Sequence, residues 1–339
     1  MWLNYVWFLL FVVIITGYLI LDGFDIGVGI MHMFVAKNDD ERRLTLNSIG
    51  PIWDGNEVWL VLGGGVLFAA FPIVYASLFS GFYIPLMLVL LFLILRTVAI
   101  EFRSKREDPS WRSRWDFIFF LSSAALAFLL GVAFGNIISG VPLDQQGNII
   151  INSVLDLLHP FALWIGATTI VMLALHGSIY LNLKTAGDLQ QRVRSNIPWL
   201  LGLFAAMGVL TFVFMFLGNY QPIAIYYQFW PLIFPLVAAL ASVGVWITVR
   251  RGAEFWAFVC SAVLVAFSMF SVAVGLFPNL LVSTTNPQYN LTIFNAASQT
   301  NTLTILLIIA VIGIPFVLLY TAGVYYIFRG KVQLSPDSY

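Results

Sequence analysis

The sequence predicts an all-α, polytopic integral membrane protein with nine transmembrane helices. Its 339 residues are 60% hydrophobic and only 9% charged, whereas about a quarter of the residues of a soluble domain are charged. Nine segments reach the roughly 20 mostly apolar residues that a membrane span needs. Lysine and arginine gather in alternate connections between these segments, which is the charge pattern of a multi-pass protein. The formal net charge of zero argues against nucleic acid as a partner.

One membrane domain is expected to cover residues 1–339. The first segment is long enough to tilt or to project beyond the bilayer, and we expect it to be retained, because it lacks the basic region and cleavage site of a signal peptide. The stretch FPIVYASLFSGFY is expected to hold a tight turn between the second and third spans. A weak internal similarity between spans one to four and spans five to eight predicts two four-helix groups with the ninth helix at the periphery. The predicted spans are 4–34, 52–74, 79–102, 115–139, 159–183, 197–217, 229–249, 254–277 and 303–328.

The basic residues predict the orientation of these spans. They follow spans one, three, five, seven and nine, whereas the connections 141–158, 218–228 and 278–302 contain no lysine or arginine. The positive-inside rule then places the N-terminus outside and the C-terminus in the cytoplasm. Of the 16 basic residues only Arg96 departs from this pattern, because it lies inside span three.

Acidic residues gather in the cytoplasmic halves of the first two spans. Asp22 and Asp25 are three residues apart and share one face of span one. Span two opens with SIGPIWDGNEVW, which places Asp54 in its first turn and Glu57 three residues further on. A carboxylate in hydrocarbon is costly unless it has a partner, water or a proton. These four acids therefore need an explanation.

A single buried arginine is expected to serve this acidic group. Arg96 lies seven residues before Arg103, or about 10 Å below the cytoplasmic interface, and Asp116 opens span four at the same side. Because one guanidinium does not compensate five carboxylates, the surplus acids must be hydrated or protonated, as a proton path requires. The alternative is a structural ion pair between Arg96 and one acid, with the other acids reaching headgroup water.

The three histidines do not predict a haem or metal site in this chain. His159 and His176 lie 17 residues apart on one span, about 25 Å along a helix, and His32 lies at the inner end of span one. No two histidines are expected to face each other across neighbouring spans, as a bis-histidine haem site requires.

Glycines and aromatic residues predict packing and membrane anchoring. Gly23 and Gly27 form a small-xxx-small pair, and residues 63–65 are three glycines in span two, so both segments favour close helix contact. Aromatic residues near span ends are expected to lie at the membrane interfaces. They include Trp2, Trp7, Trp111, Trp115 and Tyr325.

Several motifs resemble subunit II of cytochrome bd-type quinol oxidases, including the cyanide-insensitive branch. The first 140 residues carry the closest resemblance, in LDGFDIGVGI, in the long stretch from NDDERRL to SLFSGFY, and in RTVAIEFRSK. RWDFIFF, GVAFGN and the late LLYTAGVYY also match the family pattern. The family has nine spans in this subunit, with an outside N-terminus.

The resemblance implies a partner that carries the redox centres. In this family subunit I holds two b-type haems, the oxygen-reducing haem (b or d type) and the quinol-oxidising loop, whereas subunit II binds no haem. The resemblance leaves room for a structural quinone or lipid and for a small single-span subunit. Asp25, Trp53, Asp54, Arg96 and Asp116 match characteristic polar residues of the family, whereas some members carry Gln at the position of Glu57.

We therefore expect a haem-free subunit of a quinol:oxygen oxidoreductase of the respiratory chain, in a bacterial or archaeal cytoplasmic membrane. It would stabilise the haem-bearing subunit and lead protons from the cytoplasm to the site where oxygen is reduced to water. The alternatives are a proton-coupled secondary transporter and a purely structural scaffold. The expected proton path comprises Asp54 as the first acceptor and Asp22, Asp25 and Glu57 as the relay, with Arg96, Asp116, Trp53 and Asn56 as orienting residues.

Overall fold

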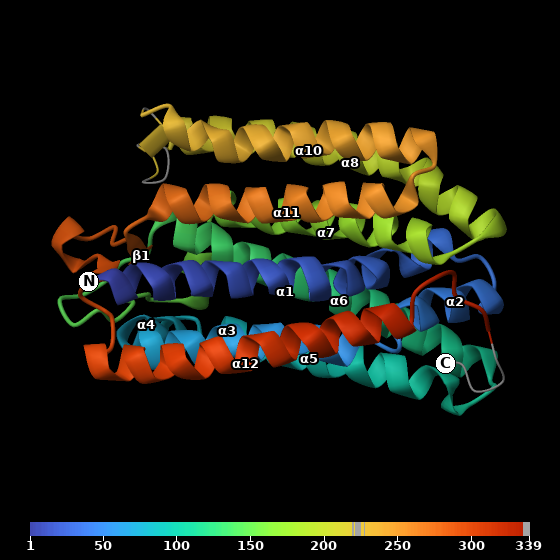
Figure 1. Cartoon of the computed structure of the whole chain (residues 1–339), viewed down its shortest axis with the longest axis horizontal. Coiled ribbons are helices and arrows are strands. Elements are labelled where there is room, and N and C mark those ends of the chain that lie inside the picture. The colour runs from blue at the N-terminus through green and yellow to red at the C-terminus, as the bar shows by residue number, and fades with distance from the viewer. Residues whose placement is uncertain (219, 221–224, 227, 335–339) are drawn as a thin grey trace.

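A computed structural model describes residues 1–218, 220, 225–226 and 228–334 as an elongated helical bundle (Figure 1). Among these residues, eight helices are long and apolar enough to cross a membrane. This confirms an all-α, polytopic membrane protein. The eight helices are α1 (Trp2–Val35), α5 (Tyr83–Phe102), α6 (Pro109–Ser139), α7 (Pro160–Lys184), α8 (Gly187–Leu217), α10 (Ile233–Arg251), α11 (Glu254–Leu276) and α12 (Thr300–Ile327).

The second expected span corresponds to α3 (Trp53–Ala70), which is not among these eight helices. It is only 18 residues long, and its first two turns contain Asp54, Asn56 and Glu57. The helix nevertheless packs closely on α1. A Cβ atom at Gly63 would lie only 2.6 Å from the Ile15 side chain, so a larger residue would not fit there without a shift. Figure 1 shows α3 running along the bundle with α1 and α12.

The prediction of a tight turn between spans two and three is wrong. The segment instead forms a ten-residue helix, α4 (Pro72–Gly81), and the next helix begins at Tyr83. Phe71 has φ −133° and ψ 61°, which interrupts the helical path, and Pro72 then occupies the first turn of α4. Proline suits that place because its missing N–H would have no partner there.

A short helix after α1 was also missed. In α2 (Asp39–Ile49) the Asn38 side chain accepts a hydrogen bond from the Glu41 N–H at 2.9 Å, which caps the helix. Acidic residues fill its first turn, where the helix dipole favours them. The short 3-10 helix η1 (Arg103–Lys105) extends α5.

Two connections pack together at the end of the bundle where the chain starts. Strands β1 (Asn279–Leu281) and β2 (Leu291–Thr292) form an antiparallel pair, and Val141 bridges to Ser283. These connections also contain η2 (Val154–Leu157) and η4 (Pro287–Tyr289), while η3 (Trp230–Leu232) precedes α10.

Glycines bring α1 against its neighbours, as the sequence predicted. A Cβ atom on Gly27 would lie 1.9 Å from the Leu173 carbonyl oxygen of α7, and one on Gly29 would lie 2.0 Å from the Ser123 Oγ of α6. Residues 64 and 65 have nothing within 4 Å of such an atom, so they do not serve this close packing.

Two of the expected interfacial aromatics point into the protein instead. Trp7 is 3% exposed, and its Nε1 donates a hydrogen bond to the Leu303 carbonyl at 3.0 Å. The Tyr325 hydroxyl points inward to the side chain of Asn56. Both side chains thus find a hydrogen-bond partner on another helix, as Trp and Tyr usually do when they are buried.

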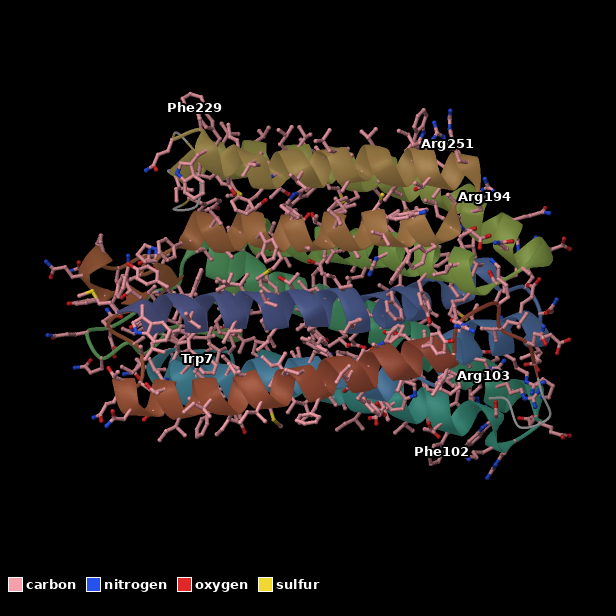
Figure 2. The ribbon with its side chains drawn as sticks, in the orientation of Figure 1. Trp7, Phe102, Arg103, Arg194, Phe229 and Arg251 are labelled. Atoms are coloured by element: carbon pink, nitrogen blue, oxygen red, sulfur yellow. The ribbon has the colours of Figure 1, made fainter. Side chains whose placement is uncertain are left out.

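The two ends of the bundle differ in charge. Figure 2 shows Arg103, Arg194 and Arg251 at one end, and Trp7 and Phe229 at the other. We call the first of these the basic end. Helix α1 begins at the opposite end and reaches the basic end after Asp22 and Asp25.

Candidate functional site

Two groups of charged side chains lie in the half of the bundle near the basic end. The inner group comprises Asp22, Asp25, Asn56, Glu57 and Arg96. The outer group comprises His32, Asp39, Arg42, Arg103, Arg112 and Asp116.

A buried ion pair connects α1 to α5 within the inner group. The Arg96 Nη2 donates to one oxygen of Asp22 at 2.6 Å, and Nη1 donates to the other at 3.2 Å. Asp22 is 0% exposed and Arg96 is 1% exposed. This bidentate geometry offsets the cost of removing both charges from water. Asp22 is thus the acid that Arg96 neutralises directly.

Asp25 lies one turn further along α1 and has no such cation. Its Oδ2 accepts a hydrogen bond from the Asn56 Nδ2 at 2.7 Å. Its Oδ1 is buried and makes no hydrogen bond within the described part of the chain. Arg96 acts on Asp25 and Glu57 through charge but is hydrogen-bonded to Asp22.

The remaining polar residues expected here lie along the start of α3. Asp54 is exposed, whereas Trp53 and Glu57 are half-buried and Asn56 is buried. Acidic side chains thus range from the exposed Asp54 through Glu57 to the fully buried Asp25. The structure brings five expected residues into one neighbourhood, namely Asp22, Asp25, Asn56, Glu57 and Arg96.

The outer group surrounds Asp116 with donors. Arg103 donates from Nε at 2.5 Å and Arg42 from Nη1 at 2.9 Å. The His32 Nε2 lies 2.8 Å from Asp116 Oδ1, and because a carboxylate only accepts, this nitrogen carries the hydrogen. The other ring nitrogen of His32 is hydrogen-bonded to the Thr45 hydroxyl at 2.6 Å.

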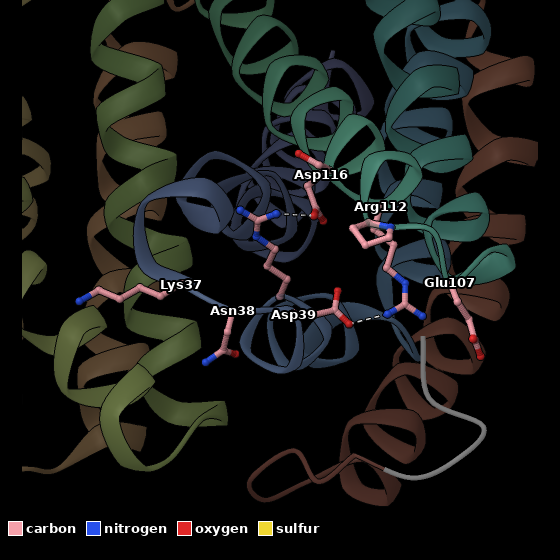
Figure 3. Close-up of a pocket in the computed structure, with 9 residues that line it drawn as sticks. Lys37, Asn38, Asp39, Glu107, Arg112 and Asp116 are labelled. Atoms are coloured by element: carbon pink, nitrogen blue, oxygen red, sulfur yellow. Dashed lines mark hydrogen bonds and ion pairs between the residues drawn. The ribbon is translucent and has the colours of Figure 1, made fainter.

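Asp39 extends the outer group to the surface. It accepts from Arg103 at 2.7 Å and from Arg112 at 2.6 Å. Asp39 and Arg112 border a cavity of about 290 Å³ between the start of α2 and the start of α6, with Asp116 in its wall (Figure 3). Three arginines thus serve two carboxylates, so each carboxylate of the outer group is hydrogen-bonded to two arginines and none lacks a cation.

The partners of Asp116 differ from the expected one, because Asp116 pairs with Arg42 and Arg103 and not with Arg96. Arg103 follows span three, as expected, but it lies in η1 and is 0% exposed, which the sequence did not predict. The seven-residue spacing between Arg96 and Arg103 was the signal that could have indicated this burial, because residues seven apart on a helix share a face. Arg96 on α5 and Arg103 in η1 therefore bind carboxylates at two depths, about 10 Å apart along the helical path.

Hydrogen bonds occupy the ring nitrogens of the buried histidines. The His176 Nε2 donates to the Ile20 carbonyl at 2.9 Å, and Nδ1 lies 2.9 Å from the Ser261 hydroxyl. His159 caps α7 by accepting the Ala162 N–H at 3.3 Å. Over the described residues, no three His, Cys, Asp or Glu side chains are placed to hold a metal ion.

Known proteins place this architecture in a family. The model of the family described as "Cytochrome bd terminal oxidase subunit II" matches residues 3–328. Cytochrome bd-I ubiquinol oxidase subunit 2 of Escherichia coli strain K12 is 34% identical, over 97% of this chain and 95% of that protein. Cytochrome bd ubiquinol oxidase subunit 2 of Bacillus subtilis strain 168 is 36% identical, over 98% of this chain and 97% of that protein.

The fold also matches a solved structure. A chain of the bd oxidase from Geobacillus thermodenitrificans superposes with a TM-score of 0.80 at 17% sequence identity, and the match covers 97% of this chain and all of the other. At this identity the likeness concerns the fold alone.

Proposed function

This chain belongs to the cytochrome bd terminal oxidase subunit II family, and on that premise we propose that it is the haem-free subunit of its complex and carries protons toward the oxygen site. As a family member it is a multi-pass subunit of an oxidoreductase in the cytoplasmic membrane, with subunit I as partner. The two b-type haems and the oxygen-reducing haem are assigned to subunit I. The hydrogen bonds on His32 and His176 support this assignment, since haem iron needs a free ring nitrogen.

The observation that carries the proton path is the unmatched carboxylate of Asp25. Arg96 is hydrogen-bonded to Asp22, so Asp25 retains one oxygen without a partner in a fully buried place. Buried polar atoms normally have a hydrogen-bond partner, and a carboxyl group in this setting needs water or a proton. Arg96 Nε is also a buried polar atom without a hydrogen bond. We assign it and the free oxygen of Asp25 to one hydrated stretch.

The path is proposed to start at the basic end, which we assign to the cytoplasm by the positive-inside rule. With α3 counted as the ninth span, this assignment puts the N-terminus outside. Asp54, which is exposed, takes up the proton, and Glu57 and Asp25 pass it inward. Protons consumed from the cytoplasm, combined with quinol protons released outside, make the reaction electrogenic without a pump.

A proton-coupled transporter is the less favoured alternative. Alternating access needs a polar route on both sides of a midplane site. Among the described residues, the buried Asp and Arg side chains are Asp22, Asp25, Arg96, Arg103 and Asp116, and all belong to the two groups near the basic end. A route open to one side suits delivery to a partner subunit.

Substitution of Asp25 by Asn in the purified complex tests the proposal. The variant retains the shape of the side chain but cannot take up and release a proton, so oxygen consumption should fall about 100-fold, which is typical for loss of a proton-transfer group. Haem content should match the parent. Asp188→Asn, at an exposed site in the first turn of α8, is the matched control. Parent-like turnover of Asp25→Asn would leave the structural scaffold as the better function.

A further inference from the structure

Tyr325 is an inward-facing residue on a helix that is mostly exposed. Of the residues of α12, only Leu303 is fully buried. Tyr326 and Ile327 are 65% and 72% exposed. The Tyr325 hydroxyl, in contrast, donates a hydrogen bond to the Asn56 Oδ1 of α3 at 2.9 Å. A tyrosine in this place connects the last helix to the inner group.

The hydroxyl completes the hydrogen bonds that hold the Asn56 amide in one orientation. The Asn56 Nδ2 donates to Asp25 Oδ2 at 2.7 Å and also approaches the Leu21 carbonyl at 3.3 Å. A carbonyl and an ionised carboxylate are both acceptors only. If the amide were rotated by half a turn, its oxygen would face these two acceptors. The Tyr325 hydroxyl supplies the donor that holds Oδ1 on the opposite side.

The ring of Tyr325 is held by aromatic neighbours from other helices. It meets Phe24 of α1 edge-on, with ring centroids 6.5 Å apart. Phe24 in turn stacks on Tyr180 of α7 at 3.9 Å, and the Tyr180 hydroxyl donates to the Ser48 carbonyl at 2.9 Å. Because these contacts involve the ring, they remain when only the Tyr325 hydroxyl is removed.

We propose that Tyr325 is a positioning residue for the proton path. Through Asn56 it holds Oδ2 of Asp25 in a hydrogen bond and leaves Oδ1 as the atom that gains and loses the proton. This assignment rests on the proposed function of Asp25. Tyr325 takes no part in the transfer itself, in which one O–H bond breaks at the donor and one forms at Oδ1. Without the Tyr325 hydroxyl, Asn56 Oδ1 loses a hydrogen bond, and the amide is held less firmly on Oδ2 of Asp25.

The test compares Tyr325→Phe with Tyr326→Phe in the purified complex. Tyr325→Phe should lower turnover about 3- to 10-fold, which corresponds to the loss of one hydrogen bond in the rate-limiting geometry. The ratio of turnover in H₂O to that in D₂O should rise, because slower proton delivery then limits the rate. A merely structural role would leave this ratio unchanged. The exposed Tyr326→Phe should match the parent in both measurements, and haem content should be the same in all three.

The variants Asn56→Ala and Asp25→Asn separate the positioning role of Tyr325 from the proton path through Asp25. Asn56→Ala removes the amide but leaves the Tyr325 ring on Phe24, and it should raise the isotope ratio at least as much as Tyr325→Phe. Parent-like turnover and isotope ratio in Tyr325→Phe, with Asp25→Asn impaired, would overturn the positioning role alone. Parent-like turnover in Asp25→Asn would instead overturn the proton path. The double variant Tyr325→Phe/Asp25→Asn should be no slower than Asp25→Asn, because the two act as one unit.

Discussion

The inner and outer groups use the same kinds of side chain and share helix α1, yet they differ in charge balance. Helix α1 contributes Asp25 to the inner group and His32 to the outer group, about two turns apart. Around Asp116 and Asp39, three arginines supply the hydrogen bonds. Around Asp22, Asp25 and Glu57, Arg96 is the arginine that acts on all three. The outer group is therefore suited to holding helices together, and the inner group is left with acids that need water or protons.

This contrast separates two uses of buried charge. A buried ion pair ties elements together but roughly breaks even in free energy against apolar side chains. A buried acid without its own cation is unfavourable for stability, and such groups cluster at functional sites. The comparison predicts that an Asp→Asn substitution lowers turnover at Asp25 in the inner group and lowers stability at Asp116 in the outer group.

Removal of Arg96 is expected to have the largest effect on stability. Arg96→Leu would leave the Asp22 carboxylate buried without its partner, which typically costs about 3–5 kcal/mol. The expected result is a much lower yield of assembled complex and a lower unfolding temperature, measured on the detergent-purified oxidase. The double variant Arg96→Leu/Asp22→Leu should recover most of the loss. A single variant as stable as the parent would show that this pair is not the matched part of the inner group.

Asp116→Asn should have a smaller effect, and on stability alone. The amide oxygen still accepts one hydrogen bond, and Arg103 keeps its contact with Asp39, so we expect a loss of about 2 kcal/mol. Turnover per haem in the assembled complex should stay within about twofold of the parent. This change is smaller than the one expected from the loss of a hydrogen bond that sets the rate-limiting geometry. Thermal unfolding and oxygen consumption on the same preparation measure both. A collapse of turnover without loss of stability would place Asp116 in the proton path and remove the distinction between the groups.

Hydropathy and charge patterning predict most of the bundle. The nine expected segments correspond to α1, α3 and the other long helices, because span length and the cost of charge in hydrocarbon constrain the sequence strongly. The α3–α4 corner was missed because Pro72 opens a helix as readily as it ends one. α2 was missed because a short polar helix has no apolar stripe over enough turns to show its period.

The sequence places the acids correctly on their helices but does not assign their partners. It identifies Arg96 as the exceptional arginine, yet which carboxylate it binds depends on how α1 and α5 rotate against each other. Gly27 and Gly29 permit the close packing of α1 on its neighbours, and such packing is a property of pairs of helices. Tyr325 illustrates the same limit, since its inward contact depends on where α12 docks, 269 residues away from Asn56 in the sequence.

The smallest expected effect concerns the pair of Glu41 and Arg192 at the rim of the bundle, which is matched but only partly buried. Partial burial acts to raise the pKa of Glu41, but the Lys37 N–H, donating at 2.7 Å, and the Arg192 guanidinium lower it below its usual value of 4.5.

Because the folded-state pKa is lowered, the carboxylate stabilises the fold above the unfolded-state value and loses this contribution as the pH falls through the folded-state value. Glu41→Gln should thus lower the unfolding temperature slightly at pH 7, by an amount corresponding to less than about 1 kcal/mol. This difference from the parent should shrink at pH 4 and below. A gap that stays constant with pH would mean that the hydrogen bonds of Glu41, and not its charge, stabilise this contact, so that charge matching outside the buried groups contributes nothing measurable.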